Sequence, residues 1–284
     1  MHTLNDELLF TKDNTPSRAK DLTQNGKRLI IDSRLDFASS VTSCGLTLFR
    51  TSGKYGYIDI SGRIVIPVLF DYATDFSING TAVVAVNGKY GYIDTDGNYI
   101  VEPSFDGALP FSAIGLALVW VGSRYGYIEK NGKYAISPRF ECAYSFSDLG
   151  IARAELNEKY GFISVDGDFI IPAVYDYASD FAPCGLALVL YEGKYGYIDI
   201  YGEFIISPKF DDAYDFTAAG LAAVRLDNKY GYIDTIGRFI INPTFNTLAS
   251  SPDDDCVYTQ SYTDTGSKSS ISDCLGNSIF EIKC

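Results

Sequence analysis

A Tyr-Gly dipeptide recurs six times in this chain at a constant interval of 35 residues. The six tyrosines, each preceded by a lysine or arginine, are Tyr55, Tyr90, Tyr125, Tyr160, Tyr195 and Tyr230. A strict period of this length is the signature of a repeat architecture, in which each repeat packs against its neighbours to form a continuous core. A residue type present in six equivalent copies is expected to be structural, because catalysis requires one site rather than six.

The composition of the 284-residue chain is that of a globular protein, with 46% apolar and 14% aromatic residues. The formal net charge of −13 disfavours nucleic acid and anionic membranes as partners and suits a basic or uncharged partner. The chain lacks the run of about 18 apolar residues that predicts a spanning helix. The first ten residues include Asp6 and Glu7 and lack a signal-peptide pattern, so we expect a cytoplasmic location, with non-classical export left open.

The six cysteines show neither a Cys-x-x-Cys pair nor the spacing of a metal site. Cys44 and Cys184 occupy the same repeat position, just before Gly45 and Gly185. This placement predicts small, buried, free thiols rather than a disulfide framework. We expect no metal and no cofactor.

One repeat predicts a three-stranded antiparallel meander, illustrated by residues 186–206. Strands are expected over 186–191, 194–199 and 203–206, with turns between them and Ser207-Pro208 as the stop. Residues 210–216 carry Phe, Ala and Phe at steps of three, which predicts one tight helical or 3₁₀ turn.

Side-chain alternation along these strands predicts which residues face the core. Ala187, Val189 and Tyr191 share the expected core face of the first strand. The glycine of each Tyr-Gly step indicates close approach by another backbone or a ring. Two aromatic rows are expected to stack between repeats. The first row is the six tyrosines given above, and the second is Tyr57, Tyr92, Tyr127, Phe162, Tyr197 and Tyr232.

Both ends of the chain carry weaker copies of the repeat, as capping repeats do. We predict one continuous repeat domain of about eight repeats. Its parts are a degenerate cap over residues 1–45, six regular repeats over 46–245 and a second degenerate cap over 246–284. Residues 7–31 can hold three short strands with a turn at Asn25-Gly26, and residues 250–255 are expected to form a loop.

The full phrase resembles the bacterial WG (or KWG) repeat. It reads Lys-aromatic-Gly-aromatic-Ile-Asp, Gly, Ile-Ile-x-Pro, Phe-Asp-x-Ala-x-x-Phe and Gly-Leu-Ala-x-Val, and it covers roughly residues 46–245. The chain departs from the family in having tyrosine where the namesake tryptophan stands, and a buried tyrosine hydroxyl needs a partner. The resemblance implies an all-β repeat array in a protein that mediates interactions, without a reaction or a cofactor. We expect an open β-superhelix, with a closed propeller-like ring as the alternative.

Residues with catalytic potential are few or repeated. His2 is the only histidine, and the P-loop, Gly-x-Gly-x-x-Gly and Gly-x-Ser-x-Gly motifs are missing. The recurrent carboxylates, such as Asp71 and Asp75, are interpreted as turn caps or as partners of the repeated cation. Asp94-Thr95-Asp96-Gly97 is interpreted as a turn rather than a calcium loop. We therefore predict a protein that is not an enzyme, with a carboxylate-based hydrolase as a remote alternative.

Function is expected where the repeats disagree. The second face of the first strand varies most, and its candidate partner-binding residues are Leu118, Trp120, Arg153, Glu155, Leu188, Leu190 and Arg225. If this face is exposed, an apolar patch with charged neighbours would bind a protein. On that hypothesis Trp120→Ala weakens binding with little change in melting temperature. The equal alternative is that the face packs against the adjacent sheet. Carbohydrate or small-ligand binding by the repeated aromatic residues is the second hypothesis for function.

Overall fold

The computed structural model describes residues 36–248 without a break, together with strands over 20–24, 27–31, 256–263, 266–273 and 278–283. Side chains are described for residues 36–247. The chain forms two compact units, Met1–Gly150 and Ile151–Cys284. No helix among the described residues is long and apolar enough to cross a membrane.

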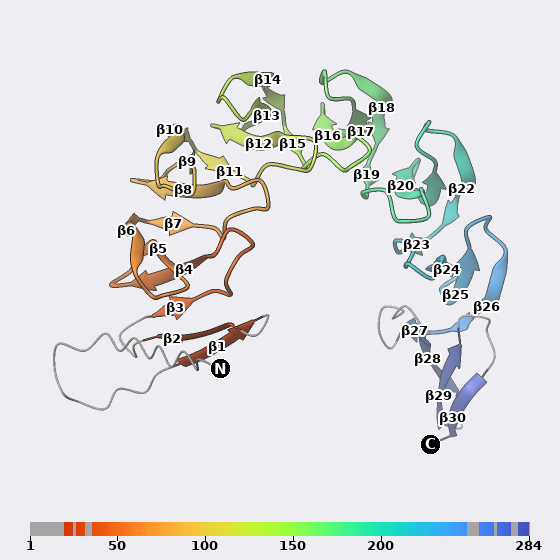
Figure 1. Cartoon of the computed structure of the whole chain (residues 1–284). Coiled ribbons are helices and arrows are strands. Elements are labelled where there is room, and N and C mark those ends of the chain that lie inside the picture. Colours follow the sequence, from red (N-terminus) through yellow and green to blue (C-terminus); the bar gives the residue numbers. More distant parts are fainter. Residues whose placement is uncertain are drawn as a thin grey trace. The chain divides into compact units, whose positions relative to one another are not determined.

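The predicted three-stranded meander is present in every regular repeat (Figure 1). The first strands are β4 (Leu46–Thr51), β8 (Ala82–Val86), β12 (Leu116–Val121), β16 (Ala152–Leu156), β20 (Ala187–Tyr191) and β24 (Leu221–Leu226). The second strands are β5 (Lys54–Asp59), β9 (Lys89–Ile93), β13 (Arg124–Glu129), β17 (Lys159–Ile163), β21 (Lys194–Ile198) and β25 (Lys229–Asp234). The third strands are β6 (Ile64–Phe70), β10 (Tyr99–Phe105), β14 (Tyr134–Phe140), β18 (Phe169–Tyr175), β22 (Phe204–Phe210) and β26 (Phe239–Phe245).

Each meander is preceded by a two-residue strand that the sequence did not predict. These strands are β3 (Phe37–Ala38), β7 (Tyr72–Ala73), β11 (Gly107–Ala108), β15 (Cys142–Ala143), β19 (Tyr177–Ala178), β23 (Asp212–Ala213) and β27 (Thr247–Leu248). β23 pairs with β24, through Asp212 with Arg225 and Ala213 with Val224. The predicted helical turn over residues 210–216 is therefore wrong. The apolar side chains at steps of three are buried because the chain bends at Asp211, not because it coils.

The resulting four-stranded sheets run in chain order, for example β7-β8-β9-β10 in the first unit and β19-β20-β21-β22 in the second. No described strand pairs with a strand of another sheet, so backbone hydrogen bonding closes no barrel among the described residues. The predicted all-β tandem array is confirmed. The predicted limits of the two caps and of a single domain stay predictions.

The chain ends contain strands in the places where degenerate repeats are predicted. β1 (Lys20–Gln24) and β2 (Lys27–Ile31) pair antiparallel, as expected for residues 7–31. A third N-terminal strand and the turn at Asn25-Gly26 lie outside the described residues. β28 (Cys256–Thr263), β29 (Gly266–Asp273) and β30 (Ser278–Lys283) form the last meander. The predicted loop over residues 250–255 also lies outside the described part of the chain.

The third strand does not stop at the proline, contrary to prediction. β22 continues through Pro208 to Phe210, because it is the edge strand of its sheet and the missing N–H of proline leaves no ladder bond unmade. Its register shifts between Tyr195 and Tyr197, so the backbone around Pro208 bulges over Gly196. A Cβ at Gly196 would lie 2.7 Å from the Ile206 carbonyl oxygen. The predicted close approach at the repeated glycine is thus confirmed.

The core lies between consecutive sheets within each unit. The second aromatic row is fully buried, whereas the first row is half-buried. Ala187 and Val189 on the predicted core face are completely inaccessible, and Tyr191 is half-buried. In the first five regular repeats the second-row ring packs on the last phenylalanine of the following aromatic-x-x-Ala-x-x-Phe motif, with ring centroids 4.7 Å apart for Tyr57 and Phe76. The motif therefore joins one repeat to the next.

Candidate binding surface

The repeated cation and the recurrent carboxylate 17 residues later form an ion pair between consecutive repeats. The pairs are Lys54–Asp71, Lys89–Asp106, Arg124–Glu141, Lys159–Asp176 and Lys194–Asp211. In the second pair Lys89 Nζ lies 2.6 Å from Asp106 Oδ1, while Asp106 Oδ2 accepts the Gly122 N–H at 2.6 Å. The hydrogen bond from Lys89 is the main cause of the lowered pKa of Asp106. The predicted pairing of these carboxylates with the repeated cation is confirmed.

The second-row tyrosines find partners for their hydroxyls in the next repeat. Tyr57, Tyr92, Tyr127 and Tyr197 each donate to the backbone carbonyl 17 residues on, at 2.6–2.8 Å. Burial raises the pKa of Tyr92, and it raises the pKa of Tyr232 to about 12. These four second-row tyrosines therefore have hydrogen-bonded hydroxyls in the core, whereas the tyrosines that replace the namesake tryptophan of the family are the half-buried first row.

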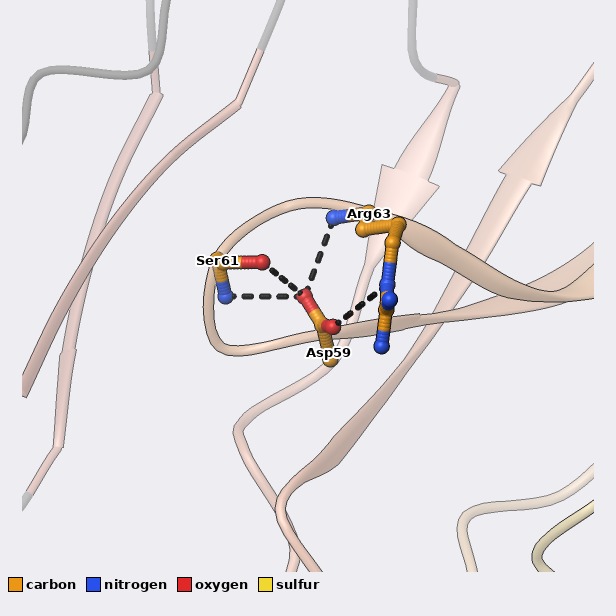
Figure 2. A network of polar contacts seen from close by, with 3 residues as sticks. All are labelled: Asp59, Ser61 and Arg63. Carbon is orange, nitrogen blue, oxygen red and sulfur yellow. Dashed lines mark hydrogen bonds and ion pairs between the residues drawn. The ribbon is translucent and has the colours of Figure 1, made fainter.

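The Asp-x-x-Gly turn between the second and third strands is held by its own aspartate. Asp59 Oδ1 accepts the Ser61 N–H at 2.9 Å, the Ser61 hydroxyl at 2.6 Å and the Arg63 N–H at 3.0 Å (Figure 2). Arg63 Nε lies 3.2 Å from Asp59 Oδ2. The hydrogen bond from Ser61 is the largest cause of the lowered pKa of Asp59.

Asp94 caps its turn in the same way, accepting the backbone N–H groups of Asp96 and Asn98 at 3.0 and 2.8 Å. The prediction of a turn at this sequence is confirmed. Among the described residues, no cluster of three or more histidine, cysteine or acidic side chains could hold a metal ion. The pKa values of six described aspartates are lowered by hydrogen bonds that their carboxylates accept; these are Asp59, Asp71, Asp94, Asp106, Asp211 and Asp234.

The variable face of the first strand is not the exposed surface that the sequence analysis considered. Leu118 and Leu188 are 2% and 4% exposed, and Arg153 is 8% exposed, so at these three positions the alternative of packing inside the fold holds. The physical reason is that the first strand lies inside its sheet and is covered on both faces. Trp120, Glu155, Leu190 and Arg225 are half-buried, and their role in partner binding stays a prediction.

The Trp120 ring occupies the space that a side chain at position 107 would fill, because residue 107 is glycine. Trp120 is the backbone partner of Gly107, and a Cβ added to Gly107 would lie 1.7 Å from the tryptophan ring. The ring centroid is 5.5 Å from Tyr125 and 6.5 Å from Tyr90. In the preceding repeat the sizes are reversed, because Tyr72 pairs with Ala85. The single tryptophan is therefore one half of a complementary packing pair.

Arg153 is a second departure from the repeat that is matched by a change in its backbone partner. Its backbone partner is Phe162, the one second-row residue without a hydroxyl. Arg153 donates to the Ala178 carbonyl in the next repeat, and its Nε lies 3.6 Å from Asp180. In this copy the hydrogen bond to a backbone carbonyl of the next repeat is therefore donated by Arg153, whereas in other copies the second-row tyrosine donates it.

Cys44 and Cys184 are exposed free thiols, so the predicted burial of both is wrong. Each precedes a glycine with positive φ in a surface turn, which explains why the side chain points away from the core. The described thiols, including Cys142, form no disulfide, as expected.

An exposed apolar patch occurs instead on the Asp-x-x-Gly turns of the second unit. Tyr201 is 79% exposed and Ile236 is 61% exposed. The other four copies of this position are Ser61, Asp96, Asn131 and Asp166, all polar and exposed. Phe204, Ile205 and Ile240 are also exposed on the strands that follow these two turns. We call these five residues the turn patch.

The two turns of the turn patch belong to consecutive, packed repeats. A Cβ at Gly237 would lie 3.2 Å from the Ile206 side chain, so the second turn rests on the third strand that follows the first turn. Aligning the turn position across the six copies would have found the patch from sequence.

The repeats match a family model described as "WG containing repeat" over residues 55–90, 90–122, 125–160, 160–195, 195–230 and 230–251. The chain is similar to a crystal structure of the eukaryotic initiation factor, with a TM-score of 0.50, 12% identity and coverage of 95% of this chain and 85% of that chain. It also matches Saccharomyces cerevisiae Sqt1, with a TM-score of 0.41, 11% identity and coverage of 90% and 86%. No curated protein matches the chain. At these identities the structural likeness concerns the fold alone.

Proposed function

The chain belongs to the WG repeat family, and from that premise we propose that it is a non-enzymatic scaffold that binds another protein through the turn patch. The observation that carries the proposal is the pair Tyr201 and Ile236, which expose apolar surface where every other regular repeat exposes a polar residue. Exposed apolar residues on neighbouring turns are a feature of interaction sites. Tyrosine at the centre of such a patch is a common hot-spot residue.

The chemistry of the partner follows from the charge around the patch. The chain carries a net charge of −13, and Glu203 is exposed between Tyr201 and Phe204. Complementary charge speeds association and suppresses wrong partners. We therefore expect a partner with an apolar contact surface bordered by lysine or arginine.

The alternative of carbohydrate binding by the first-row tyrosines has less support. Their rings are half-buried and contact other rings, as Tyr90 does with Tyr72 at 5.6 Å and with Trp120 at 6.5 Å. A sugar needs an accessible aromatic face on which to stack. The contacts between rings cover much of the aromatic surface on which a sugar could stack.

The test compares three forms of the full chain as bait in the native organism. These are the unchanged protein, the double variant Tyr201→Ser with Ile236→Ser, and the control Ile78→Ser. Ile78 is 88% exposed and lies outside the turn patch. We expect one protein to be retained by the unchanged bait and the control and lost with the double variant. Calorimetry with that purified protein should show affinity at least tenfold weaker for the double variant.

The substitutions introduce a residue that Ser61 shows to be compatible with the turn, so the melting temperature should stay within about 2 °C. Equal affinity of the double variant and the unchanged protein for the purified partner would refute the role of the turn patch. Selective binding to a glycan array, with no protein retained, would favour the carbohydrate alternative.

A further inference from the structure

A pocket of about 480 Å³ lies in the second unit, at the end of the sixth regular repeat. It is lined by Tyr214, Arg225, Asn228, Tyr230, Asn246 and Thr247. None of these belongs to the turn patch, so the pocket is an independent feature. Its volume falls within the range of about 300–1,000 Å³ that is usual for small-molecule sites.

The first difference between the pocket and the same place in the other repeats is a missing carboxylate. Asn246 stands where the five preceding copies carry an aspartate or glutamate that pairs with the repeated cation. Lys229 donates to Asn246 Oδ1, so at this position the cation meets a neutral amide. The charge of this pair alone is one unit more positive than that of the five preceding pairs.

The second difference is a missing ring. In two other copies the residue of the short strand is a tyrosine that reaches the first-row tyrosine of the preceding repeat: Tyr72 reaches Tyr55 at 6.4 Å and Tyr177 reaches Tyr160 at 6.5 Å. The corresponding residue beside Tyr230 is Thr247, whose backbone partner is Gln260. Because neither position carries an aromatic residue, the space next to Tyr230 is open.

Arg225 supplies the pocket with hydrogen-bond donors. Its guanidinium lies over the Tyr230 ring, 5.8 Å from the centroid, and one terminal nitrogen donates to the Asp211 carbonyl at 3.4 Å. Arg225 Nε is buried and has no hydrogen-bond partner among the described residues. Two carboxylates lie close by: Asp212 accepts the Tyr230 hydroxyl at 3.1 Å, and Asp211 has a pKa that is lowered first by Lys194 and further by Arg225.

The first regular repeat provides an internal comparison. Arg50 lies over Tyr55 at 5.5 Å from the ring centroid, and its Nε is also buried without a hydrogen-bond partner. There, however, Asp71 pairs with Lys54, and the Tyr72 ring occupies the space beside Tyr55. The same arginine–tyrosine pair is thus covered in one place and open in the other.

We propose that the pocket binds a carboxylate, supplied by a uronic acid or by the C-terminal residue of a peptide. Arginine matches the planar carboxylate with paired N–H donors, and the side chains of Asn228 and Thr247 can donate to it as well. Stacking on Tyr230 holds the guanidinium in place. Asp212 disfavours a dianion such as phosphate, because two negative charges would face its carboxylate.

The test is a titration of the ¹⁵N-labelled full chain followed by NMR. The carboxylate probes are glucuronate and N-acetyl-alanyl-alanine, each compared with its uncharged analogue, glucose or the peptide amide. We expect saturable shifts of the backbone amides of Asn228 and Asn246 with a carboxylate probe at millimolar concentration. Affinity should fall at least tenfold with its uncharged analogue. The tighter of the two acids identifies the source of the carboxylate.

Two variants introduce groups that are present at the same positions in other repeats, a carboxylate and an aromatic ring. Asn246→Asp returns the carboxylate and Thr247→Tyr returns the ring, and each should weaken binding of the tighter acid at least tenfold. Asp71→Asn in the first unit is the matched control and should leave the Asn228 and Asn246 shifts unchanged. Equal shifts with acid and uncharged analogue, tighter binding of phosphate, no saturable shift, or unaltered affinity in both variants would overturn the proposal.

Discussion

The contact between Trp120 and Gly107 in the first unit and the pocket beside Tyr230 in the second are both departures from the repeat, but they differ in compensation. At Gly107 the loss of a side chain makes room for the tryptophan ring, so the volume is conserved. Beside Tyr230 the ring and the carboxylate are lost together, at Thr247 and Asn246, and a pocket remains. Paired departures preserve packing, whereas unpaired departures leave surface available for a ligand.

Arg153 is also a departure from the repeat that a change in its backbone partner compensates. It carries the hydrogen bond to the next repeat in the copy where Phe162 lacks a hydroxyl. In a strict repeat, a departure must therefore be examined together with its backbone partner before a function is assigned to it.

The largest expected effect is that of Trp120→Ala. Removing the ring leaves a cavity beside Gly107, and we expect a loss of about 3 kcal/mol in unfolding free energy by denaturant titration. This reverses the expectation, drawn from the sequence, of a small change in melting temperature. Adding Gly107→Tyr to Trp120→Ala recreates the Tyr72–Ala85 arrangement and should recover about half of the loss. A double variant less stable than Trp120→Ala would show that the two positions are not complementary.

The next effect is expected for Arg153→Leu. The Ala178 carbonyl loses its donor, and an unsatisfied buried acceptor costs about 1–3 kcal/mol. Combining it with Phe162→Tyr reproduces the Leu188–Tyr197 pair of the next repeat, in which the hydroxyl donates to a backbone carbonyl. Thermal unfolding of the two single variants and the combined one measures the coupling. Additive losses would argue against the exchange of donors.

The smallest expected effect is a difference in acid sensitivity. Hydrogen bonds from Lys54 and Lys194 are the first cause of the lowered pKa values of Asp71 and Asp211. A carboxyl with a lowered pKa in the folded state stabilises the fold fully above its unfolded value of about 4 and loses that contribution as the pH falls further. Asn246→Asp should therefore steepen the loss of stability between about pH 4 and 2, and Asp71→Asn should flatten it. Superimposable denaturation midpoints across that window for all three proteins would exclude the effect.

Much of the fold could be predicted because its determinants are local. The period, the three strands of the meander, the glycine under the edge-strand bulge and the Asp-x-x-Gly turn each depend on residues within one repeat. The repeated ion pair was also predictable as one of two structural roles for the recurrent carboxylates. The short strand was missed because its partner, such as Arg225 for Asp212, lies in the following first strand, and the period-three spacing of its apolar residues resembles a helical pattern.

The sequence by itself determined the repeat, its register and the structural nature of the six-fold Tyr-Gly step, since these follow from residue type and spacing. The tertiary structure decided which departures from the repeat are accessible. Leu118 and Leu188 lie on the face of the first strand opposite the predicted core face, and neighbouring sheets cover both faces of that strand. Burial depends on what lies opposite a residue, and the residue opposite belongs to another strand or repeat. The accessible departures from the repeat are therefore Tyr201, Ile236 and the residues that line the pocket beside Tyr230, rather than residues of the first strand.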